Sequence, residues 1–452
     1  MLSNPIQSRI PRLLLGFLTV MFAVGLVVPA QSIAQDLLTL ESAIRTGLKN
    51  NYTIQITQNQ QQIAENNNSL GNAGFLPRVS ASAQGSKSVT SSQQEYFTGT
   101  TNNRDNAGAS SLNADVALNW TIFDGFQMFA SKSRLQQLES QGKLNTRITI
   151  ESTVSDIVNA YYNIVRQQQT LAVLKDAMNI SRERVDIAQA KLNVGSGSGL
   201  ELLQAKADHN ADKSAVIRQQ AVVSNAKTDL NKILARDLET AFTVTDTIPL
   251  IPDLQKDSLM ADIEAQNSQL EKMKTDQEVA RLNLHLIESK RYPEVGVNLG
   301  YNFAQSSSES GFLKSNKSQG YSFGVSASVG LFDGLNIDRQ AENAKIQIRN
   351  SRFQYQDLLD QIRSNFNKTW QDYENGLQLV SLELVNVQVA QQTVNVAREK
   401  YRLGSITPLE LKEAQKSYIQ SESRLVDARY QAKQAETELL RLSGRLLQHF
   451  PQ

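Results

Sequence analysis

The chain repeats one series of motifs, and this internal repeat restricts its fold more than any other feature of the sequence. The triplet Phe-Asp-Gly stands at 123–125 and again 209 residues later, at 332–334. The same spacing aligns KLNVGSGSGLELLQA (191–205) with YRLGSITPLELKEA (401–414). Upstream, a spacing of 216 residues aligns LPRVS (76–80) with YPEVG (292–296), and Asn51 with Asn267. Because several motifs agree on one register, the sequence predicts two structural repeats, 35–248 and 249–452.

Each repeat carries two runs in which apolar and small or polar residues alternate. The predicted strands cover about 78–86 and 111–123 in the first repeat, and about 294–304 and 320–332 in the second. One face of the second strand is apolar: Leu112, Ala114, Val116, Leu118, Trp120 and Ile122. The opposite faces hold mostly Ser, Asn, Gly and Ala. A soluble sandwich is the alternative, but two hairpins are too few to build one, so the pattern favours membrane strands.

Aromatic residues gather at the strand ends, as in the two interfacial girdles of a membrane barrel. The expected membrane-interface anchors are Tyr301, Phe303, Tyr321 and Phe323 near the loop, with Trp120, Phe123 and Phe332 at the other end. The polar segments 86–111 and 304–320 are expected to be solvent loops on the outer side.

Four strands cannot form a membrane structure by themselves. An open sheet in lipid leaves two edges of unpaired backbone groups, and the smallest barrels need about eight strands. The strands must therefore be shared between chains, and three copies of four strands would close a barrel of twelve.

Long segments without a helix breaker follow each strand pair. Long helices are predicted for 126–193 and 199–236, and again for 335–402 and 408–443. No proline occurs between Phe126 and Asn193, and 68 helical residues extend about 100 Å. Spacings of three and four mark coiled-coil seams at Leu171, Leu174, Met178, Ser181, Val185, Ala188 and Leu192, and at Val380, Leu384, Val387, Gln391 and Val394.

The ends of these helices are marked by glycine and by capping residues. Gly195 and Gly404 are expected to end the first helix of each pair. Capping boxes are expected at Ser198–Glu201 and Thr407–Glu410, which gives both glutamates a sufficient structural role. In each Phe-Asp-Gly, the Phe is expected to anchor at the membrane interface, the Asp to cap the next helix, and the Gly to turn the backbone.

The remaining composition excludes several classes of protein. Residues 1–34 are predicted to be a signal peptide, since Arg9 and Arg12 precede 16 apolar residues, fewer than the ~20 that span a bilayer as an uncleaved anchor. A net charge of +1 argues against nucleic-acid binding, and the absence of Cys excludes disulfides and a lipid-bearing cysteine. His209, His285 and His449 are far apart in sequence. No catalytic, metal or cofactor arrangement is found, so no enzyme activity is expected.

These motifs, in this order, resemble the TolC-like outer membrane efflux proteins of Gram-negative bacteria. The resemblance covers nearly all of the chain after the signal peptide. It implies an α+β membrane protein that forms a homotrimer, with a twelve-stranded β-barrel in the outer membrane continued by a periplasmic α-helical barrel. It also implies an exit duct for efflux or type I secretion, with a periplasmic adaptor, an inner-membrane transporter and outer-membrane lipid as partners. A coiled-coil protein that spans the periplasm without conducting is the alternative.

The resemblance also assigns roles to residues at the helical hairpin ends. The periplasmic tip, where adaptors dock, matches Val194, Gly195, Ser196 and Gly197, and Leu403, Gly404, Ser405, Ile406 and Thr407. The channel constriction matches Glu201, Tyr401, Glu410 and Glu413. The sequence departs from the family where Ile406 replaces a basic residue and Glu replaces Asp at the acidic positions. A ring of three Glu413 side chains is expected to set cation preference or pH response.

Overall fold

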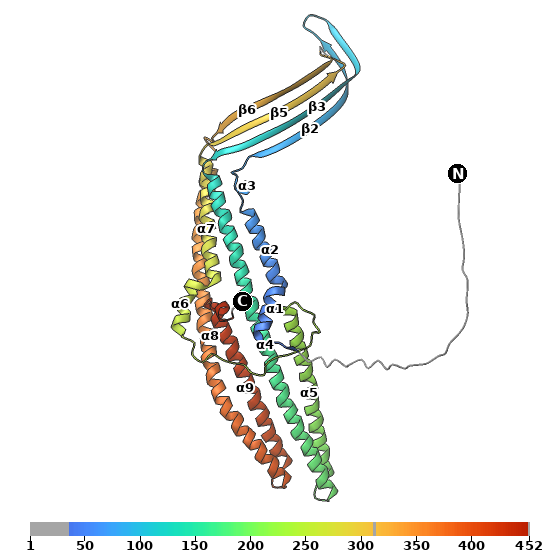
Figure 1. Ribbon diagram of the computed structural model, residues 1–452, viewed down its shortest axis with the longest axis vertical. Helices are drawn as coiled ribbons and strands as arrows, with labels where there is room; N and C mark the ends of the chain where they lie inside the picture. The colour runs from blue at the N-terminus through green and yellow to red at the C-terminus, as the bar shows by residue number, and fades with distance from the viewer. Residues whose placement is uncertain (1–35, 311–312, 451–452) are drawn as a thin grey trace, which may run out of the picture.

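The computed structural model describes residues 36–310 and 313–450, so the predicted signal peptide 1–34 lies outside the described residues. A small β-sheet stands at one end of long helices, which confirms the expected combination of long helices with few strands (Figure 1). Within the described ranges, no helix combines the length and the apolar character that crossing a membrane requires.

Both halves of the chain contain short helices, then two long strands, then two long helices. The first half contains β1 (Asp36–Leu37), α1 (Leu40–Asn50), α2 (Tyr52–Asn67), α3 (Leu70–Ala73), β2 (Arg78–Glu95), β3 (Thr101–Asp124), α4 (Gln127–Asn193), α5 (Gly199–Ile233) and β4 (Phe242–Thr243). The second half contains α6 (Lys256–Gln266), α7 (Ser268–Glu288), the 3-10 helix η1 (Ser289–Arg291), β5 (Glu294–Ser308), β6 (Ser315–Ser328), α8 (Asn336–Arg402), α9 (Pro408–Leu442) and α10 (Leu446–His449). Helices α4 and α8 both have 67 residues, and α5 and α9 both have 35.

The four long strands form one antiparallel sheet in the order β2-β3-β5-β6. Its register places the alternating apolar residues of all four strands on one face. One row across the sheet is Val79, Leu118, Leu299 and Phe323, and the next is Ala81, Val116, Tyr301 and Tyr321. A row of the opposite face is Ser80, Ala117, Gly300 and Ser322. This apolar face carries exposed Leu, Phe and Tyr, and within the described ranges no element covers it, a pattern typical of the lipid-facing side of membrane strands.

Two expectations about the strand ends are wrong. The segment 86–111 is mostly strand, because β2 runs to Glu95 and β3 starts at Thr101, leaving 96–100 as the turn. Likewise β5 extends to Ser308 and β6 starts at Ser315, inside the expected loop 304–320. Strand formation depends on a hydrogen-bonded backbone partner more than on apolar side chains, and here the β-ladder continues between mostly polar residues. At the other end, β6 stops at Ser328, because its partner β5 begins at the paired Glu294.

The anchors at the inner end of the sheet differ from one another. A bulge between Thr121 and Phe123 brings Phe123 opposite Val295, on the apolar face. The indole Nε1 of Trp120 donates a hydrogen bond to the Phe75 carbonyl at 2.9 Å. Phe332 lies beyond the end of β6 and is exposed.

Both Phe-Asp-Gly segments turn the backbone from the sheet into a long helix. Gly125 and Gly334 have φ of 66° and 69°, a left-handed conformation that glycine adopts without cost. Asp333 caps α8, since its carboxylate accepts hydrogen bonds from the backbone N–H groups of Asn336 (3.1 Å) and Ile337 (2.8 Å). The same role expected for Asp124 is wrong: α4 has no side-chain cap, because Asp124 is still paired in β3 with Glu294.

The two turns predict different responses to one substitution. A Cβ at Gly125 would overlap the Ser289 carbonyl oxygen and lie 2.6 Å from Tyr292 Cβ, whereas at Gly334 the nearest atom is 3.6 Å away. We expect Gly125→Ala to lower the free energy of unfolding by about 3 kcal/mol or more. The matched Gly334→Ala carries only the φ penalty of about 1 kcal/mol. Thermal unfolding in detergent, followed by circular dichroism, measures both; equal losses would contradict the packing argument.

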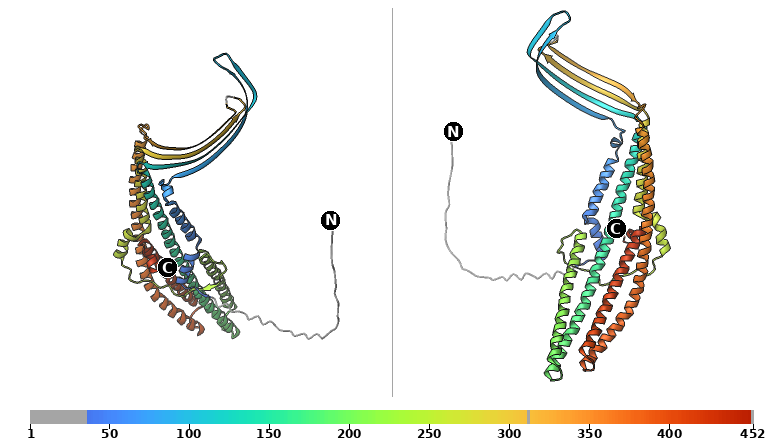
Figure 2. Two further views of the ribbon diagram at one scale, coloured as in Figure 1. Left: turned by 45° about the horizontal axis from the view of Figure 1, so that its top comes forward. Right: turned by 180° about the vertical axis from the view of Figure 1, so that it is seen from behind.

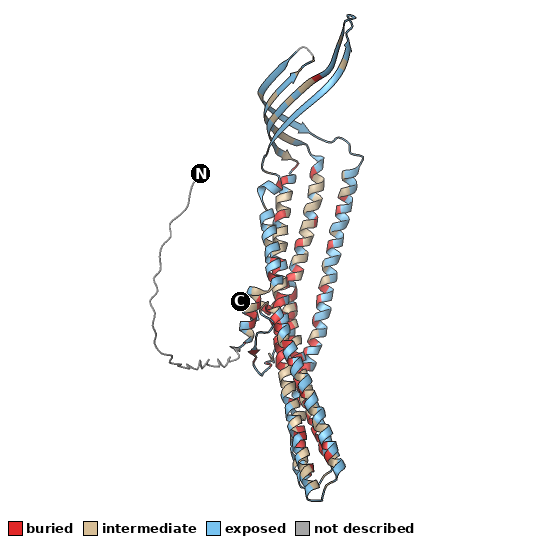
Figure 3. Ribbon diagram, turned by 90° about the vertical axis from the view of Figure 1, so that its right-hand side faces the viewer, coloured by how far each residue is buried: buried red, intermediate tan, exposed pale blue. Residues whose placement is uncertain are grey.

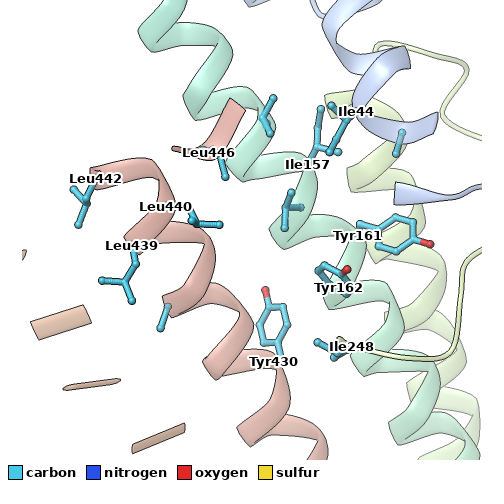
Figure 4. Close-up of a cluster of buried hydrophobic side chains, with 14 of the residues drawn as sticks. Ile44, Ile157, Tyr161, Tyr162, Ile248, Tyr430, Leu439, Leu440, Leu442 and Leu446 are labelled. Atoms are coloured by element: carbon cyan, nitrogen blue, oxygen red, sulfur yellow. The ribbon is translucent and has the colours of Figure 1, made fainter. Parts of the chain in front are cut away.

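The main hydrophobic core lies halfway along the helices (Figure 3). Here α1, α4 and the end of α9 pack together with α10 and the linker residue Ile248 (Figure 4). The parallel pair β1–β4 is tied to α4, because the Tyr161 hydroxyl donates to the Leu38 carbonyl at 3.0 Å. Asn51 caps α2 and donates to the Ile233 carbonyl (2.8 Å), and Asn267 caps α7 and donates to the Leu442 carbonyl (2.9 Å). These contacts fix where the shorter helices join the long ones.

The buried seam of α8 differs in part from the predicted one. Its buried residues include Tyr373, Gly376, Glu383, Ala390, Val394 and Tyr401, which are spaced by three, four or seven residues. Leu384 is 39% exposed, whereas its neighbour Glu383 is 6% exposed and accepts a hydrogen bond from Arg424 Nε at 2.8 Å. A charged residue with a partner therefore takes the core position that the sequence pattern gave to leucine.

Candidate functional site

The hairpins α4–α5 and α8–α9 end side by side at the end of the molecule opposite the sheet (Figures 1 and 2). Both turns contain a left-handed glycine, Gly195 (φ 75°) and Gly404 (φ 74°). In each, the next residue closes the helix: Ser196 N–H donates to the Lys191 carbonyl (2.9 Å) and Ser405 N–H to the Lys400 carbonyl (2.8 Å). These two turns contain the nine residues that the sequence assigned to a periplasmic tip.

The ends of the hairpins expose large apolar side chains. Val194 and Leu403 are each 78% exposed, and Leu200 and Leu409 stand at matching positions of the return helices and are 65% and 66% exposed. Ile406 is half-buried and packs against the cluster around Tyr401. Exposed apolar side chains concentrated at a rigid turn are typical of a protein-binding surface.

The return helices begin with different caps. Thr407 and Glu410 form the full capping box, with the Thr407 N–H donating to Glu410 Oε2 at 2.7 Å. These hydrogen bonds, from the Thr407 backbone and then its hydroxyl, lower the pKa of Glu410. At Ser198 the box is incomplete: the Ser198 hydroxyl accepts from Glu201 N–H at 3.1 Å, but the Glu201 carboxylate bonds elsewhere. The predicted capping role of Glu201 is thus only half right.

Glu201 instead joins the two hairpins. The hydroxyl of Tyr401, which is 1% exposed, donates a hydrogen bond to Glu201 Oε1 at 2.9 Å. Lys191 Nζ lies 4.3 Å from the centre of the Tyr401 ring and 3.9 Å from Glu201 Oε1. Burial, followed by the bond to Glu201, raises the pKa of Tyr401 to about 12, so the tyrosine keeps the proton that it donates. Two of the four predicted constriction residues are therefore in direct contact.

The other two predicted constriction residues lie apart from this contact. Glu410 is exposed and held by its own cap. Glu413 is exposed one helical turn further along α9. In a single chain these carboxylates lie along one side of α9, as a ring built from several copies would require.

A second connection between the hairpins is not evident from the sequence. Asp208 of α5 accepts from Arg184 of α4 (3.1 Å) and from Lys412 of α9 (2.8 Å); we call these three residues the Asp208 bridge. Burial opposes ionisation of Asp208, but the hydrogen bonds from Lys412 and Arg184 outweigh it and lower its pKa. Beside the bridge, Gln415 Nε2 donates to the Ala177 carbonyl at 2.9 Å. The sequence contains only a weak indication of this bridge: Asp208 follows Glu201 by seven residues, one heptad further along the same face of α5.

The two side edges of the molecule consist of different elements (Figure 1). One flank consists of β2, α2 and α5, which all lie beside β3 or α4. The other consists of β6 and α8, which lie beside β5, α7 and α9. Both flanks expose apolar residues at heptad spacing: Leu200, Leu203 and Ile217 on α5, and Leu382, Val385, Val389 and Val396 on α8. Apolar stripes with this spacing are typical of helices that pack against further helices.

Across the described ranges 36–310 and 313–450, no three His, Cys, Asp or Glu side chains are grouped as a metal site requires. The polar groups of the hairpin ends are instead engaged with each other. The hydrogen bonds and ion pairs between Tyr401 and Glu201 and within the Asp208 bridge can hold the two helical hairpins together, and a binding partner or a change of charge can break them.

The comparisons with known proteins agree on one family. The profile of the Outer membrane efflux protein family matches residues 43–236 and 259–445. Outer membrane efflux protein BepC of Brucella suis biovar 1 (strain 1330) is 21% identical over 424 residues, 93% of this chain and 88% of the relative.

Solved structures of outer membrane proteins share the fold. The Campylobacter jejuni CmeC outer membrane channel superimposes with a TM-score of 0.76 at 15% identity, covering 90% of this chain and 86% of that one. The outer membrane protein VceC of Vibrio cholerae gives a TM-score of 0.73 at 15% identity, covering 90% and 96%.

Proposed function

The chain belongs to the outer membrane efflux protein family, and from this premise we propose that it is the exit duct of a tripartite efflux pump or a type I secretion system. It is a protein of the Gram-negative outer membrane that extends into the periplasm, and it is a channel, not an enzyme. In the proposal, three copies form a homotrimer whose passive pore releases small molecules or proteins to the outside. The two halves, 35–248 and 249–452, act as structural repeats that double the wall contributed by each chain.

One observation carries the proposal: every layer of the molecule has one unpaired edge on each flank. Among the described elements, β2 and β6 each have one edge without a neighbouring strand, and α5 and α8 are the long helices at the two sides of the helical layer. Unpaired backbone groups cost several kcal/mol each in lipid, so β6 of one copy needs β2 of the next. Contacts between two different flanks close into a ring, and three copies supply twelve strands, a number within the range of membrane barrels.

The hairpin ends are proposed to be the docking site and the constriction. The periplasmic adaptor contacts the exposed apolar residues at the two turns, and the inner-membrane transporter delivers cargo through that adaptor. The bond between Tyr401 and Glu201, together with the Asp208 bridge, restrains the hairpins of one subunit against each other. Ile406 cannot form the ionic link of relatives with a basic residue there, so restraint rests on these bonds within the subunit.

Conductance tests the channel function directly. Purified protein inserted in a planar lipid bilayer is expected to conduct ions in steps of uniform size, while native mass spectrometry reports a trimer. A trimer that inserts but stays silent, even when the hairpins are freed by mutation, would favour the coiled-coil protein without a pore. A monomer in the membrane would contradict the assembly itself.

The tip assignment predicts a specific loss of adaptor binding in Gly404→Pro. Proline cannot adopt φ 74° and removes the N–H that bonds to the Tyr401 carbonyl at 3.1 Å, so the turn must rearrange. Gly199→Pro is the matched control, since Gly199 is the first residue of α5, where proline fits as Pro408 does in α9. Efflux should fall at least tenfold in Gly404→Pro while the barrel still inserts. Normal efflux in that variant would refute the docking site.

Glu413 is expected to make the pore selective for cations. Three exposed Glu413 side chains around one axis concentrate negative potential where the channel is narrowest. We expect Glu413→Gln to reduce cation selectivity several-fold, measured as the reversal potential in a salt gradient. Glu399→Gln, an exposed glutamate on the neighbouring helix α8, serves as the control. Equal reversal potentials for wild type and Glu413→Gln between pH 5 and 8 would remove this residue from the constriction.

A further inference from the structure

The sheet register defines where the lipid-facing band of the protein ends. On the apolar face, the innermost row contains Phe123, Val295 and Ala327, and the outermost aromatic row contains Phe303. Eight residues of β5 separate the two rows, about 27 Å along the strand. With the usual tilt of about 40°, the height is about 20 Å, somewhat less than the ~25 Å of the apolar band in membrane barrels. The next row outward therefore stands at the outer edge of the hydrocarbon.

Two lysines occupy the lipid-facing side at this outer edge. Lys317 of β6 pairs with Gln305, one row beyond Phe303, and its Nζ lies 5.5 Å from the centre of the Phe303 ring. Lys87 of β2 pairs with Ser110, which is one row further outward on the same face. Both side chains are exposed. The acidic residue of β2 is Glu95, which alternation places on this face eight residues beyond Lys87, and β6 contains no Asp or Glu.

The positions of these lysines at the two edges of the sheet matter when the ring closes. This step depends on the proposed trimer, in which β6 of one subunit lies beside β2 of the next. Lys317 and Lys87 then flank each of the three seams, with two like charges on one lipid-facing strip. The Glu309 carboxylate lies on this face beside Gly108, whose N–H it accepts at 2.7 Å, and among the described residues it forms no ion pair with Lys87 or Lys317. Two cations without a protein partner at the membrane surface require an anion from the membrane.

We propose that each subunit seam binds the phosphate of an anionic lipid of the outer leaflet through Lys87 and Lys317. The two rows below, one with Phe303 and the next with Tyr301 and Tyr321, pack against the upper acyl chains, and the lysine stems extend along them to reach the headgroup. The ligand is thus a phosphorylated amphiphile that needs both parts of the site. Such a lipid bridges two subunits and stabilises the trimer in its membrane.

Lipid retention by purified trimers tests the site. Trimers are reconstituted in vesicles of phosphatidylcholine that contain diphosphorylated lipid A, extracted in detergent, and analysed by native mass spectrometry. Wild type is expected to retain lipid A, and Lys87→Gln with Lys317→Gln to weaken binding about fivefold for each lysine. Lys368→Gln, an exposed lysine of α8 in the periplasmic part, loses the same charge and should retain lipid as wild type does.

Further probes separate the phosphate from other causes of binding. Dephosphorylated lipid A should be retained poorly by wild type, and inorganic phosphate should not displace the bound lipid. Equal retention of phosphorylated and dephosphorylated lipid, or of both by the double lysine variant, would overturn the site. Displacement by inorganic phosphate would overturn it in favour of a small-anion site. The same spectra report the oligomer: absence of any trimer refutes the proposed function, whereas intact trimers with unselective lipid retention refute only this inference.

Discussion

Val389→Asp in α8 is expected to turn the purified trimer into monomers. Val389 is 58% exposed in the single chain, and it lies in the apolar stripe with Leu382, Val385 and Val396 on the free flank. In a closed ring this stripe meets α5 of the next subunit, so the aspartate is buried without a partner. A buried unpaired charge costs several kcal/mol, and the ring contains this seam three times. Size-exclusion chromatography with light scattering, or native mass spectrometry, measures the change.

Matched variants locate the effect at the seam. Gln388→Asp adds the same charge to an exposed neighbour outside the stripe and should leave the trimer intact. Ile217→Asp places the charge on the opposite flank, in α5, and should dissociate the trimer as Val389→Asp does. Because two different flanks meet at each seam, either change alone breaks all three seams. A stable Val389→Asp trimer would show that α8 is not at a subunit contact.

Sequence patterns predict the parts of this fold in which the spacing of residues within a single strand or helix is sufficient to identify the structure. Period-two alternation places Leu118, Leu299 and Phe323 on one face, and the register aligns them in one row. The turn glycines Gly195 and Gly404 are equally readable, since a left-handed residue at a helix end needs glycine.

Features that depend on a distant partner are hidden from such patterns. Glu383 lies in the seam of α8 only because Arg424 lies opposite, and the polar part of β2 is a strand only because β3 continues beside it. The Asp208 bridge joins residues 204 positions apart in the chain. Its members each look like an ordinary charge on a helix surface, which no spacing rule distinguishes from solvated residues.

Glu201→Gln combined with Asp208→Asn is expected to open the constriction. The double variant removes the charged acceptor of Tyr401 and the carboxylate that links Arg184 with Lys412, so both connections between the hairpins are weakened. Partly buried bonds of this kind contribute about 1–3 kcal/mol each. Their joint loss, about 2 kcal/mol at the least, raises the ratio of open to closed channels about 30-fold. Single-channel recording in planar bilayers measures this as a larger mean conductance and longer open times.

The pKa directions add a test by pH. A carboxylate whose pKa is lowered in the folded state, such as Asp208, contributes its stabilisation above the unfolded pKa of about 3.9 and loses it only as pH falls through the lowered value. Between pH 5 and 8 the Asp208 bridge therefore stays closed in wild type, and the double variant should be more open throughout this range.

The control is Glu183→Gln, which removes a more exposed ion pair with Arg398 at 3.7 Å that also spans the hairpins. It should change the ratio of open to closed channels by less than about fivefold, since exposed pairs contribute about 0–1 kcal/mol. If the double variant conducts no better than Glu183→Gln, the bonds within one subunit do not hold the channel closed. The restraint must then lie at the seams between subunits, where α5 and α8 of neighbouring chains meet.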